Sequence, residues 1–342
     1  MDASSMGRYT NHRHSWSMGE AAVGMCSRLF PPLARHTGLP DGKFDGLVVP
    51  EKLENRTLEE IRMLRTRLCG ASVAVFHDLI PFKFPQFTTR RSTAEFPRYL
   101  KLLLCYDGIA AVSESSRQDL LDHWAKNRVR NPPPVETISP GTGKVFSERE
   151  VGSNGTAERP QVLMVATIEA RKNHLAVLEA CERLWTQGID FDLTLAGRLS
   201  RETGRGVLEQ IRALERKNRP IKWVGHVGDE ELKRLYQACR FTLHPSLYEG
   251  FGLPVLESLG SARPCIITDR GALAQVAQDG GCYVISDPGP NTLADAIREL
   301  LLNPALYERL VKACRERQFK RWDSYCDELT TWQRSLKKRA IN

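Results

Sequence analysis

The segment Glu249-Gly-Phe-Gly-Leu-Pro-Val-Leu-Glu257 constrains the local fold and the chemistry of this chain more than any other. Two carboxylates lie eight positions apart, and two glycines and a proline lie between them. The run before this segment, Arg240-Phe-Thr-Leu-His-Pro245, reads as a short buried strand. Pro254 suits a first helical turn, because its missing N–H would have no partner there. Gly250 and Gly252 permit backbone angles and a close ligand approach that a side chain would prevent. The segment therefore predicts a strand, a glycine loop and a helix start.

The helix start expected after this loop is a site for an anion. Its free N–H groups and the positive end of the helix dipole bind phosphate. We expect Glu257 on the first helical turn and Glu249 at the other lip of the loop. Carboxylates are poor partners for phosphate but good acceptors for sugar hydroxyls. The pattern favours a nucleotide-sugar, with the diphosphate on the helix, one glutamate at the ribose and the other at the donor hexose. An ordinary capped loop is the alternative, which the Glu-Gly-x-Gly run alone would also fit.

Composition indicates a soluble protein of two ordinary domains. The chain has 342 residues, of which 41% are hydrophobic and 26% charged, and both fractions are typical of globular proteins. No run approaches the roughly 20 apolar residues that span a bilayer, and the start has no apolar signal core. Nine cysteines are spread singly, without a Cys-x-x-Cys pair, so neither a zinc ribbon nor a redox motif is predicted. We therefore expect a cytoplasmic protein with reduced cysteines.

The formal net charge of the chain is +8, and the basic excess is concentrated in residues 312–342. Such a surface can attract anionic lipid headgroups or nucleic acid. No nucleic-acid module is apparent, so we expect no nucleic-acid partner. A solvated helical face is the commoner meaning of such a run.

Strand and helix patterns alternate from about residue 70 onward, which predicts parallel sheets with crossover helices. The polar segment 147–160 is expected to be an interdomain linker. The strands that follow it form a complete doubly wound domain, in which ligands lie beyond the carboxyl ends of the strands. Strands are predicted at 71–76, 107–113, 134–138, 161–167, 191–196, 221–224, 240–243 and 265–268.

Arg171 and Lys172 lie in the segment Thr167-Ile-Glu-Ala-Arg-Lys-Asn-His174, after the first strand of the predicted second domain. We expect both at the carboxyl edge of the sheet, facing the same cleft as the glycine loop. Two cations there can hold a diphosphate and stabilise the charge that grows on it when a sugar leaves. A solvated basic turn before a helix is the alternative interpretation.

His77 closes a predicted strand of the first domain, in the run His77-Asp-Leu-Ile-Pro81. A lone histidine in such a place is more often structural than catalytic. No paired aspartate motif of the metal-binding kind stands out, so we expect no metal site.

Three segments resemble glycosyltransferase family 4 (group 1), the retaining enzymes of GT-B fold. They are the segment 245–257, which resembles the family's donor-binding signature, the Ile-Glu-x-Arg-Lys-Asn run at 168–173, and the His-Asp-Leu-Ile-Pro run at 77–81. Ala170 replaces the proline that is usual in the second of these. The resemblance implies an α/β chain with two doubly wound Rossmann-like domains facing a central cleft, and a C-terminal helix that crosses back to the first domain.

The resemblance also implies where the domains begin and end. We expect an acceptor-binding domain at 1–146 plus 319–342, a linker at 147–160 and a nucleotide-sugar-binding domain at 161–318. Met6-Gly-Arg-Tyr-Thr10 resembles the end of the glycine loop that follows the family's first strand, but only five residues precede it. The first domain is therefore expected to lack its first strand, unless the start of the chain is misassigned.

The resemblance further implies a role for each candidate residue. Arg171 and Lys172 hold the donor pyrophosphate without a metal ion, Glu249 orients the hexose and Glu257 holds the ribose. His77 faces the donor sugar across the cleft, near the reacting carbon. The implied catalytic residues are thus His77, Arg171, Lys172 and Glu249. The loop itself is expected to bind the donor at Gly250, Phe251, Gly252 and Leu253.

The expected function is a retaining glycosyl transfer that forms an α-glycosidic bond from a nucleotide-sugar. The shared segments most resemble mannosyltransferases of O-antigen, capsule or exopolysaccharide assembly, so GDP-mannose is the favoured donor and no cofactor is expected. A saccharide or lipid-linked saccharide is the expected acceptor, with peripheral contact at the inner face of the cytoplasmic membrane. Two alternatives stay open: an inactive GT-B nucleotide-binding scaffold with a truncated first domain, and another GT-B enzyme such as a sugar phosphorylase or a nucleotide-sugar epimerase.

Overall fold

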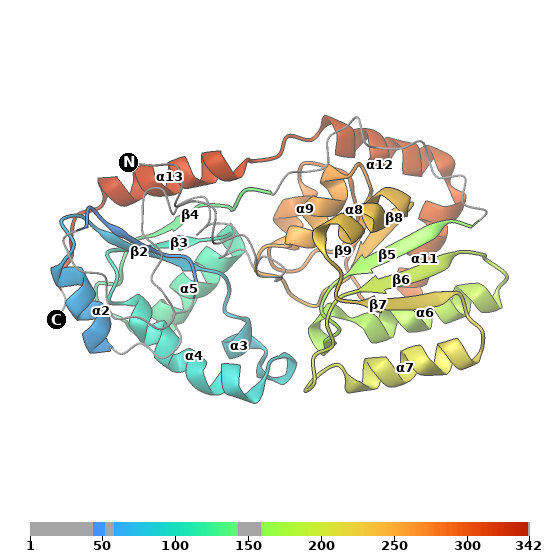
Figure 1. The fold of residues 1–342 in the computed structure, drawn as a ribbon, viewed down its shortest axis with the longest axis horizontal. Coiled ribbons are helices and arrows are strands. Elements are labelled where there is room, and N and C mark those ends of the chain that lie inside the picture. Colours follow the sequence, from blue (N-terminus) through green and yellow to red (C-terminus); the bar gives the residue numbers. More distant parts are fainter. Residues whose placement is uncertain (1–43, 52–57, 143–158, 341–342) are drawn as a thin grey trace, which may run out of the picture.

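A computed structural model describes residues 44–51, 58–142 and 159–340, which form two α/β domains that face each other (Figure 1). Each domain is built on a parallel sheet. The glycine-loop resemblance at 6–10 and most of the predicted linker at 147–160 lie outside the described residues.

The described strands form two sheets, one of order β1-β2-β3-β4 and one of order β10-β9-β8-β5-β6-β7. The first sheet consists of β1 (Leu47–Val49), β2 (Ser72–Phe76), β3 (Gly108–Ala111) and β4 (Val135–Thr137). The second consists of β5 (Gln161–Val165), β6 (Asp192–Ala196), β7 (Ile221–Gly225), β8 (Phe241–His244), β9 (Cys265–Thr268) and β10 (Cys282–Ile285).

Eight of these strands lie where the sequence predicts them, because a strand buried in a parallel sheet is a short apolar run. Strands β1 and β10 were not predicted. Both are edge strands of their sheets, and both are partly exposed. In the described part of the first domain, the sheet thus begins before residue 70, with β1 at Leu47.

Helices cover both faces of each sheet (Figure 1). Among the described helices none is long and apolar enough to cross a bilayer. The first domain contains α2 (Leu58–Thr66), α3 (Ile80–Lys83), the 3-10 turn η2 (Pro85–Phe87), α4 (Arg90–Leu103) and α5 (Glu114–Lys126). The second contains η4 (Ala170–Lys172), α6 (His174–Thr186), α7 (Arg205–Arg216), α8 (Asp229–Ala238), α9 (Leu253–Gly260), α10 (Leu273–Ala277), α11 (Pro290–Leu302) and α12 (Pro304–Glu316).

The order of the second sheet reverses between β5 and β8. Strand β5 pairs with β6 on one side and with β8 on the other, and the chain leaves β8 toward β9 on the far side. Neighbouring strands whose connections run in opposite directions open a crevice beyond their carboxyl ends, where α/β proteins bind ligands. Arg171 and Lys172 follow β5 and Glu249 follows β8, so the two predicted segments flank this crevice.

The last helix, α13 (Trp322–Ser335), crosses back and lies along the first domain, as expected (Figure 1). Gln333 donates from Nε2 to the carbonyl of Ala71 at 2.6 Å. The same helix contributes Tyr325 and Leu329 to a hydrophobic cluster that continues from the first sheet to α9 of the second domain. This helix therefore covers one face of the first sheet and joins the apolar packing of both domains.

Candidate active site

Arg171 and Lys172 lie in a single 3-10 turn, η4, directly after the loop that leaves β5. The turn is closed by a hydrogen bond from the N–H of Lys172 to the carbonyl of Glu169 at 3.2 Å. Asn173 ends it in the left-handed region, with φ of 62°. The N–H of Leu247 donates to the carbonyl of Arg171 at 2.9 Å, which ties this turn to the loop that follows β8.

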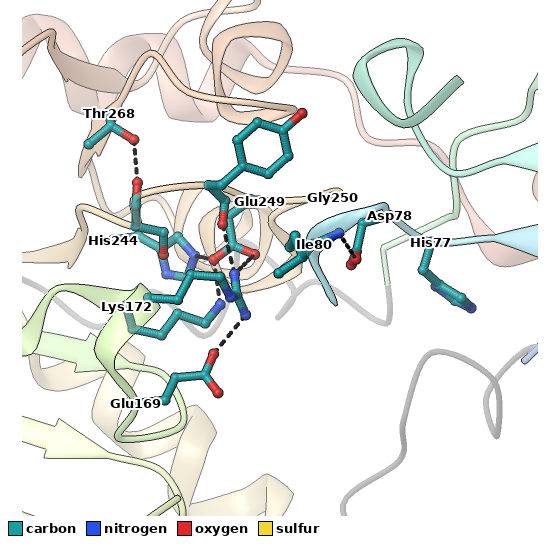
Figure 2. Close-up of polar contacts among 12 residues, drawn as sticks. His77, Asp78, Ile80, Glu169, Lys172, His244, Glu249, Gly250 and Thr268 are labelled. Carbon is teal, nitrogen blue, oxygen red and sulfur yellow. Dashed lines mark hydrogen bonds and ion pairs between the residues drawn. The ribbon is translucent and has the colours of Figure 1, made fainter. Parts of the chain in front are cut away.

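Glu249 lies at the centre of the site (Figure 2). Its Oε2 accepts from Nη1 of Arg171 at 2.9 Å, and its Oε1 accepts from Nζ of Lys172 and from Nε2 of His244 at 3.0 Å. A second carboxylate, that of Glu169, binds Nη2 of Arg171 at 2.8 Å. The structure thus brings Arg171, Lys172 and Glu249 together, as the sequence predicts, and their roles toward a donor stay predictions.

The carboxyl of Glu249 is ionised although it is only 6% exposed. Burial opposes its ionisation, but the charges of Lys172 and Arg171 outweigh burial and hold its pKa well below the ordinary value. Burial also lowers the pKa of Lys172, and repulsion from Arg171 adds to that effect, whereas Glu249 offsets part of it. Two carboxylates, Glu249 and Glu169, therefore carry the counter-charge for two largely buried cations, and Glu249 pairs with both of them.

His244 was not predicted as a site residue, since it is read from the sequence only as the end of a buried strand. It is 2% exposed, and burial lowers the pKa of its imidazole although the hydrogen bond to Glu249 opposes this. The ring is accordingly neutral near pH 7. Because a carboxylate only accepts, the ring proton lies on Nε2. His244 thus orients Glu249 without adding a third positive charge.

The glycine loop has the geometry of an anion site. Gly252 caps α9 with φ of 98°, in the left-handed region that favours glycine. In the part of the chain that the structure describes, no hydrogen bond uses the N–H of Gly250, Phe251, Gly252 or Leu253. These donors are free for an anionic ligand at the helix start.

Gly250 serves the contact between the domains as well as the loop. A Cβ added there would lie 2.6 Å from the carbonyl oxygen of His77 and 2.8 Å from Cβ of Asp78. Two serines at the start of α5 complete the contact, since Ser113 donates to the carbonyl of Gly250 at 2.7 Å and the hydroxyl of Ser116 lies 3.2 Å from the same carbonyl oxygen. Ser116 also donates to the carbonyl of His77 at 2.7 Å. Because Gly250 has no side chain, the first domain can approach the glycine loop closely.

The backbone of His77 lies at this contact, whereas its ring is turned away from Glu249 (Figure 2). The ring nitrogen Nε2 lies 2.8 Å from the carbonyl oxygen of Pro50. The described structure therefore does not bring the His77 ring into the cluster around Glu249. Its predicted place opposite the donor sugar stays a prediction.

Asp78 is the acidic residue of the first domain at this contact. It is not among the site residues that the sequence predicts. Its Oδ1 accepts from the N–H of Ile80 at 2.9 Å, and burial raises the pKa of its carboxyl while that hydrogen bond and Arg171 oppose the rise. Its place directly after His77 was the available signal, because residues at the carboxyl end of a parallel strand face the crevice.

Glu257 lies in the second turn of α9, since that helix begins at Leu253. The expectation that it falls on the first turn was wrong, because Gly252 rather than a later residue caps the helix. Its Oε2 accepts from the hydroxyl of Tyr236 at 3.0 Å. Burial raises the pKa of its carboxyl to about 7, although the bond from Tyr236 opposes this. Within the described ranges, no cluster of histidine, cysteine and acidic side chains could hold a metal ion.

Comparison with known proteins places this site in a family. The family of glycosyl transferases group 1 matches residues 147–317, which is half of the chain. The chain is 31% identical over 258 residues to a serotype-specific mannosyltransferase WbdA of Escherichia coli, a match that covers 71% of this chain and 31% of the relative. It is 29% identical over 233 residues to an O-antigen chain mannosyltransferase B of Escherichia coli, covering 64% of this chain and 57% of the relative. The chain thus spans about a third to somewhat over half of the length of these relatives.

The arrangement of the two domains is also found in solved structures. The sucrose-phosphate synthase of Thermosynechococcus elongatus superposes with a TM-score of 0.66 at 21% identity, over 85% of this chain and 73% of that one. At this identity the likeness shows the fold, and it confirms the predicted GT-B arrangement. Taken with the family match, it shows that the chain belongs to the glycosyl transferases group 1 family.

Proposed function

We propose that this chain transfers a mannosyl group from GDP-mannose to a saccharide acceptor with retention of configuration, in the assembly of an O-antigen or a similar polysaccharide. The family match supports glycosyl transfer. The relatives described as mannosyltransferases, one of them acting on the O-antigen chain, support the donor sugar and the pathway class. A saccharide or lipid-linked saccharide is the proposed acceptor, met at the inner face of the cytoplasmic membrane.

One observation carries the proposal. Arg171, Lys172 and Glu249 meet at the point where the strand order reverses, beside the free N–H groups that precede α9. Cations and backbone donors that converge on one place suit a diphosphate. A carboxylate beside them suits the hydroxyls of the attached sugar.

The diphosphate and Glu249 would compete for the same two cations. Without a donor, the carboxylate of Glu249 pairs with both Arg171 and Lys172, and that of Glu169 pairs with Arg171. A bound diphosphate would take over both cations. The oxygens of Glu249 would then be free to accept hydrogen bonds from the hexose, while His244 keeps the carboxylate in place.

Transfer then needs charge stabilisation more than a nucleophile. The bond between the anomeric carbon and the phosphate oxygen breaks, and the acceptor oxygen bonds to the same carbon on the same face. The acceptor proton passes to the leaving phosphate oxygen. Arg171, Lys172 and the N–H groups before α9 would stabilise the negative charge that grows on the diphosphate. Since these groups supply the positive charge, we propose that no metal ion is required.

The donor and the metal requirement can be tested together by thermal unfolding in the presence of GDP, GDP-mannose, UDP and UDP-glucose, each with and without EDTA. A ligand that binds the folded state raises Tm. We expect the guanosine compounds to raise Tm and EDTA to leave the increase unchanged. A preference for uridine compounds would overturn the donor, and a loss of the increase in EDTA would overturn the metal independence.

Activity is tested by Glu249→Gln and Lys172→Gln, with radiolabelled GDP-mannose and a mannose-containing acceptor. Each variant removes a charge at the diphosphate and hexose, so we expect kcat to fall by about 100-fold or more. The matched control is Lys217→Gln, at an exposed ion pair with Glu182, which should keep the wild-type rate. Near-wild-type rates in both site variants would reject the assignment. Donor binding without turnover in the wild-type protein would favour the inactive scaffold.

A further inference from the structure

A cavity of about 460 Å³ lies directly beside the site, between the two domains. Ligand sites have volumes of roughly 300–1,000 Å³, so this cavity can hold a small molecule. Its lining comes from η2 and its flanks in the first domain and from the loops after β8 and β9 in the second. The lining residues are Phe84, Gln86, Phe87, Leu247, Tyr248, Arg270 and Gly271.

Aromatic rings from both domains form one wall of this cavity. The rings of Phe84 and Phe87 are stacked with centroids 6.1 Å apart, and Phe84 packs against Tyr248 at 5.1 Å. The hydroxyl of Tyr248 donates to Oδ2 of Asp119 on α5 at 2.5 Å. Lys83 lies over the Tyr248 ring with Nζ 4.5 Å from its centroid. The wall is therefore held in place by contacts that cross between the domains.

Two polar side chains that line the cavity are Gln86 and Arg270. In the part of the chain that the structure describes, neither the amide of Gln86 nor the guanidinium of Arg270 makes a hydrogen bond or an ion pair. Both side chains are exposed. A ligand in the cavity would thus meet aromatic and apolar groups together with unused planar donors and an acceptor.

The cavity adjoins Glu249 through two backbone contacts. Tyr248 precedes Glu249, and its carbonyl accepts from Nη1 of Arg171 at 2.7 Å. Gly271 is so close that a Cβ added there would lie 2.4 Å from the carbonyl oxygen of Glu249. The N–H of Ala272 donates to that same carbonyl oxygen at 3.0 Å. A molecule in the cavity would accordingly lie next to the place where we put the donor hexose.

We propose that this cavity is a subsite for the saccharide acceptor, in which a sugar ring packs against Phe84, Phe87 and Tyr248. The inference rests on the proposed mannosyl transfer, whose acceptor it places. A pyranose has a face of C–H groups that suits the electron-rich face of an aromatic ring. Its rim of hydroxyls suits Gln86 and Arg270. A polyisoprenyl chain offers no hydrogen-bonding group to either side chain, whereas a saccharide offers hydroxyls to both, and so the lining favours a saccharide.

The subsite is tested by direct binding of α-linked mannobiose, measured by titration calorimetry and ligand-observed NMR with and without GDP. We compare the wild-type protein with Phe87→Ala and Phe82→Ala. Phe82 is the matched control, because it lies in the neighbouring helix α3, is 50% exposed and packs on His123 outside the cavity. We expect Phe87→Ala to raise the Kd for mannobiose by about tenfold, and Phe82→Ala to leave it unchanged. Gln86→Ala, at an exposed position that should not affect folding, is expected to weaken binding as well.

Three outcomes would overturn the subsite: no binding of mannobiose to the wild-type protein, equal affinity in Phe87→Ala and the wild type, or binding that depends on Phe87 for decyl phosphate but not for mannobiose. The thermal shift with GDP is recorded on the same samples. A wild-type protein that binds mannobiose but does not respond to GDP would count against the proposed donor and would leave the subsite standing.

Discussion

At the scale of single residues, the site depends on one carboxylate that binds three basic side chains. Glu249 binds Arg171, Lys172 and His244, and all but a few per cent of its surface is buried. Removal of one partner from a buried ion pair typically costs about 3–5 kcal/mol, because a charge is left without compensation. Glu249→Ala would therefore destabilise the fold as well as the chemistry. Glutamine keeps the shape and one acceptor oxygen, which makes it the cleaner substitution, although its amide NH2 cannot accept a hydrogen bond as the carboxylate oxygen does.

The pH dependence of stability should report on Glu257. Its pKa is about 7 in the folded protein against an ordinary value of 4.5. The folded state thus keeps a proton that the unfolded chain has lost, and stability from this group is fully present below about pH 4.5 and is lost as the pH rises toward 7. We expect Glu257→Gln to remove a fall of up to about 1.4 kcal/mol per pH unit in the free energy of unfolding across that window. Urea unfolding at a series of pH values measures it, and identical slopes in both proteins would contradict the prediction.

At the scale of secondary-structure elements, the start of α5 combines a local and a long-range task. The hydroxyl of Ser113 accepts from the N–H of Ser116 at 3.0 Å, which caps the helix. The same hydroxyl donates to the carbonyl of Gly250 in the other domain at 2.7 Å. One side chain therefore both starts a helix and anchors the glycine loop.

A comparison of two helix caps can separate the capping of a helix from the anchoring of the glycine loop. Thr89 caps α4 through a bond from the N–H of Ser92 at 3.2 Å, with no bond to the glycine loop. We expect Ser113→Ala and Thr89→Ala each to lower the free energy of unfolding by about 1 kcal/mol. Only Ser113→Ala should also lower kcat, because it releases the backbone at Gly250. Chemical unfolding and steady-state kinetics on both variants check this, and equal losses of kcat would argue against an anchor.

At the scale of the whole molecule, α13 and the residues that follow it return to the first domain and pack against it. Asp107 is 1% exposed and Arg65 4% exposed, and the two form an ion pair beneath that segment. Asp107 also accepts from the N–H of Arg339 at 2.6 Å and from the N–H of Ser72 at 2.7 Å. A single buried carboxylate thus connects the first sheet, α2 and the residues that follow α13.

Substitution of Asp107 should destabilise the protein strongly. Asp107→Ala leaves Arg65 charged and buried, with an expected loss of about 3–5 kcal/mol in the free energy of unfolding. The control is Asp295→Ala, at an ion pair with Arg298 in which the aspartate side chain is 71% exposed, for which we expect a change below about 1 kcal/mol. Urea unfolding of both variants is the measurement. Similar losses in the free energy of unfolding of the two variants would show that the buried ion pair contributes no more to stability than the exposed one.

Much of the fold could be predicted because its signals are local. Strands such as β2 and β5 are short apolar runs, and Ser113 is a cap followed by a helix. The edge strands β1 and β10 were missed although both are apolar, because a run of three or four residues cannot by itself be told from a loop or a helix segment. In the site, Arg171, Lys172 and Glu249 could be predicted from their segments. His244 could not, because a histidine that ends a buried strand looks the same with or without an acidic partner.

The sequence by itself determined the family, the alternation of strands and helices, and the residue types that line the crevice, because each of these depends on a few neighbouring positions. Tertiary structure alone decided that β5 lies beside β8, that Glu249 pairs with two cations, and that the ring of His77 contacts Pro50. It also decided that Phe84 meets Tyr248 to form a cavity between the domains. These contacts join segments far apart in the chain, and their energies depend on burial and shielding from water. Only the packed molecule sets those conditions.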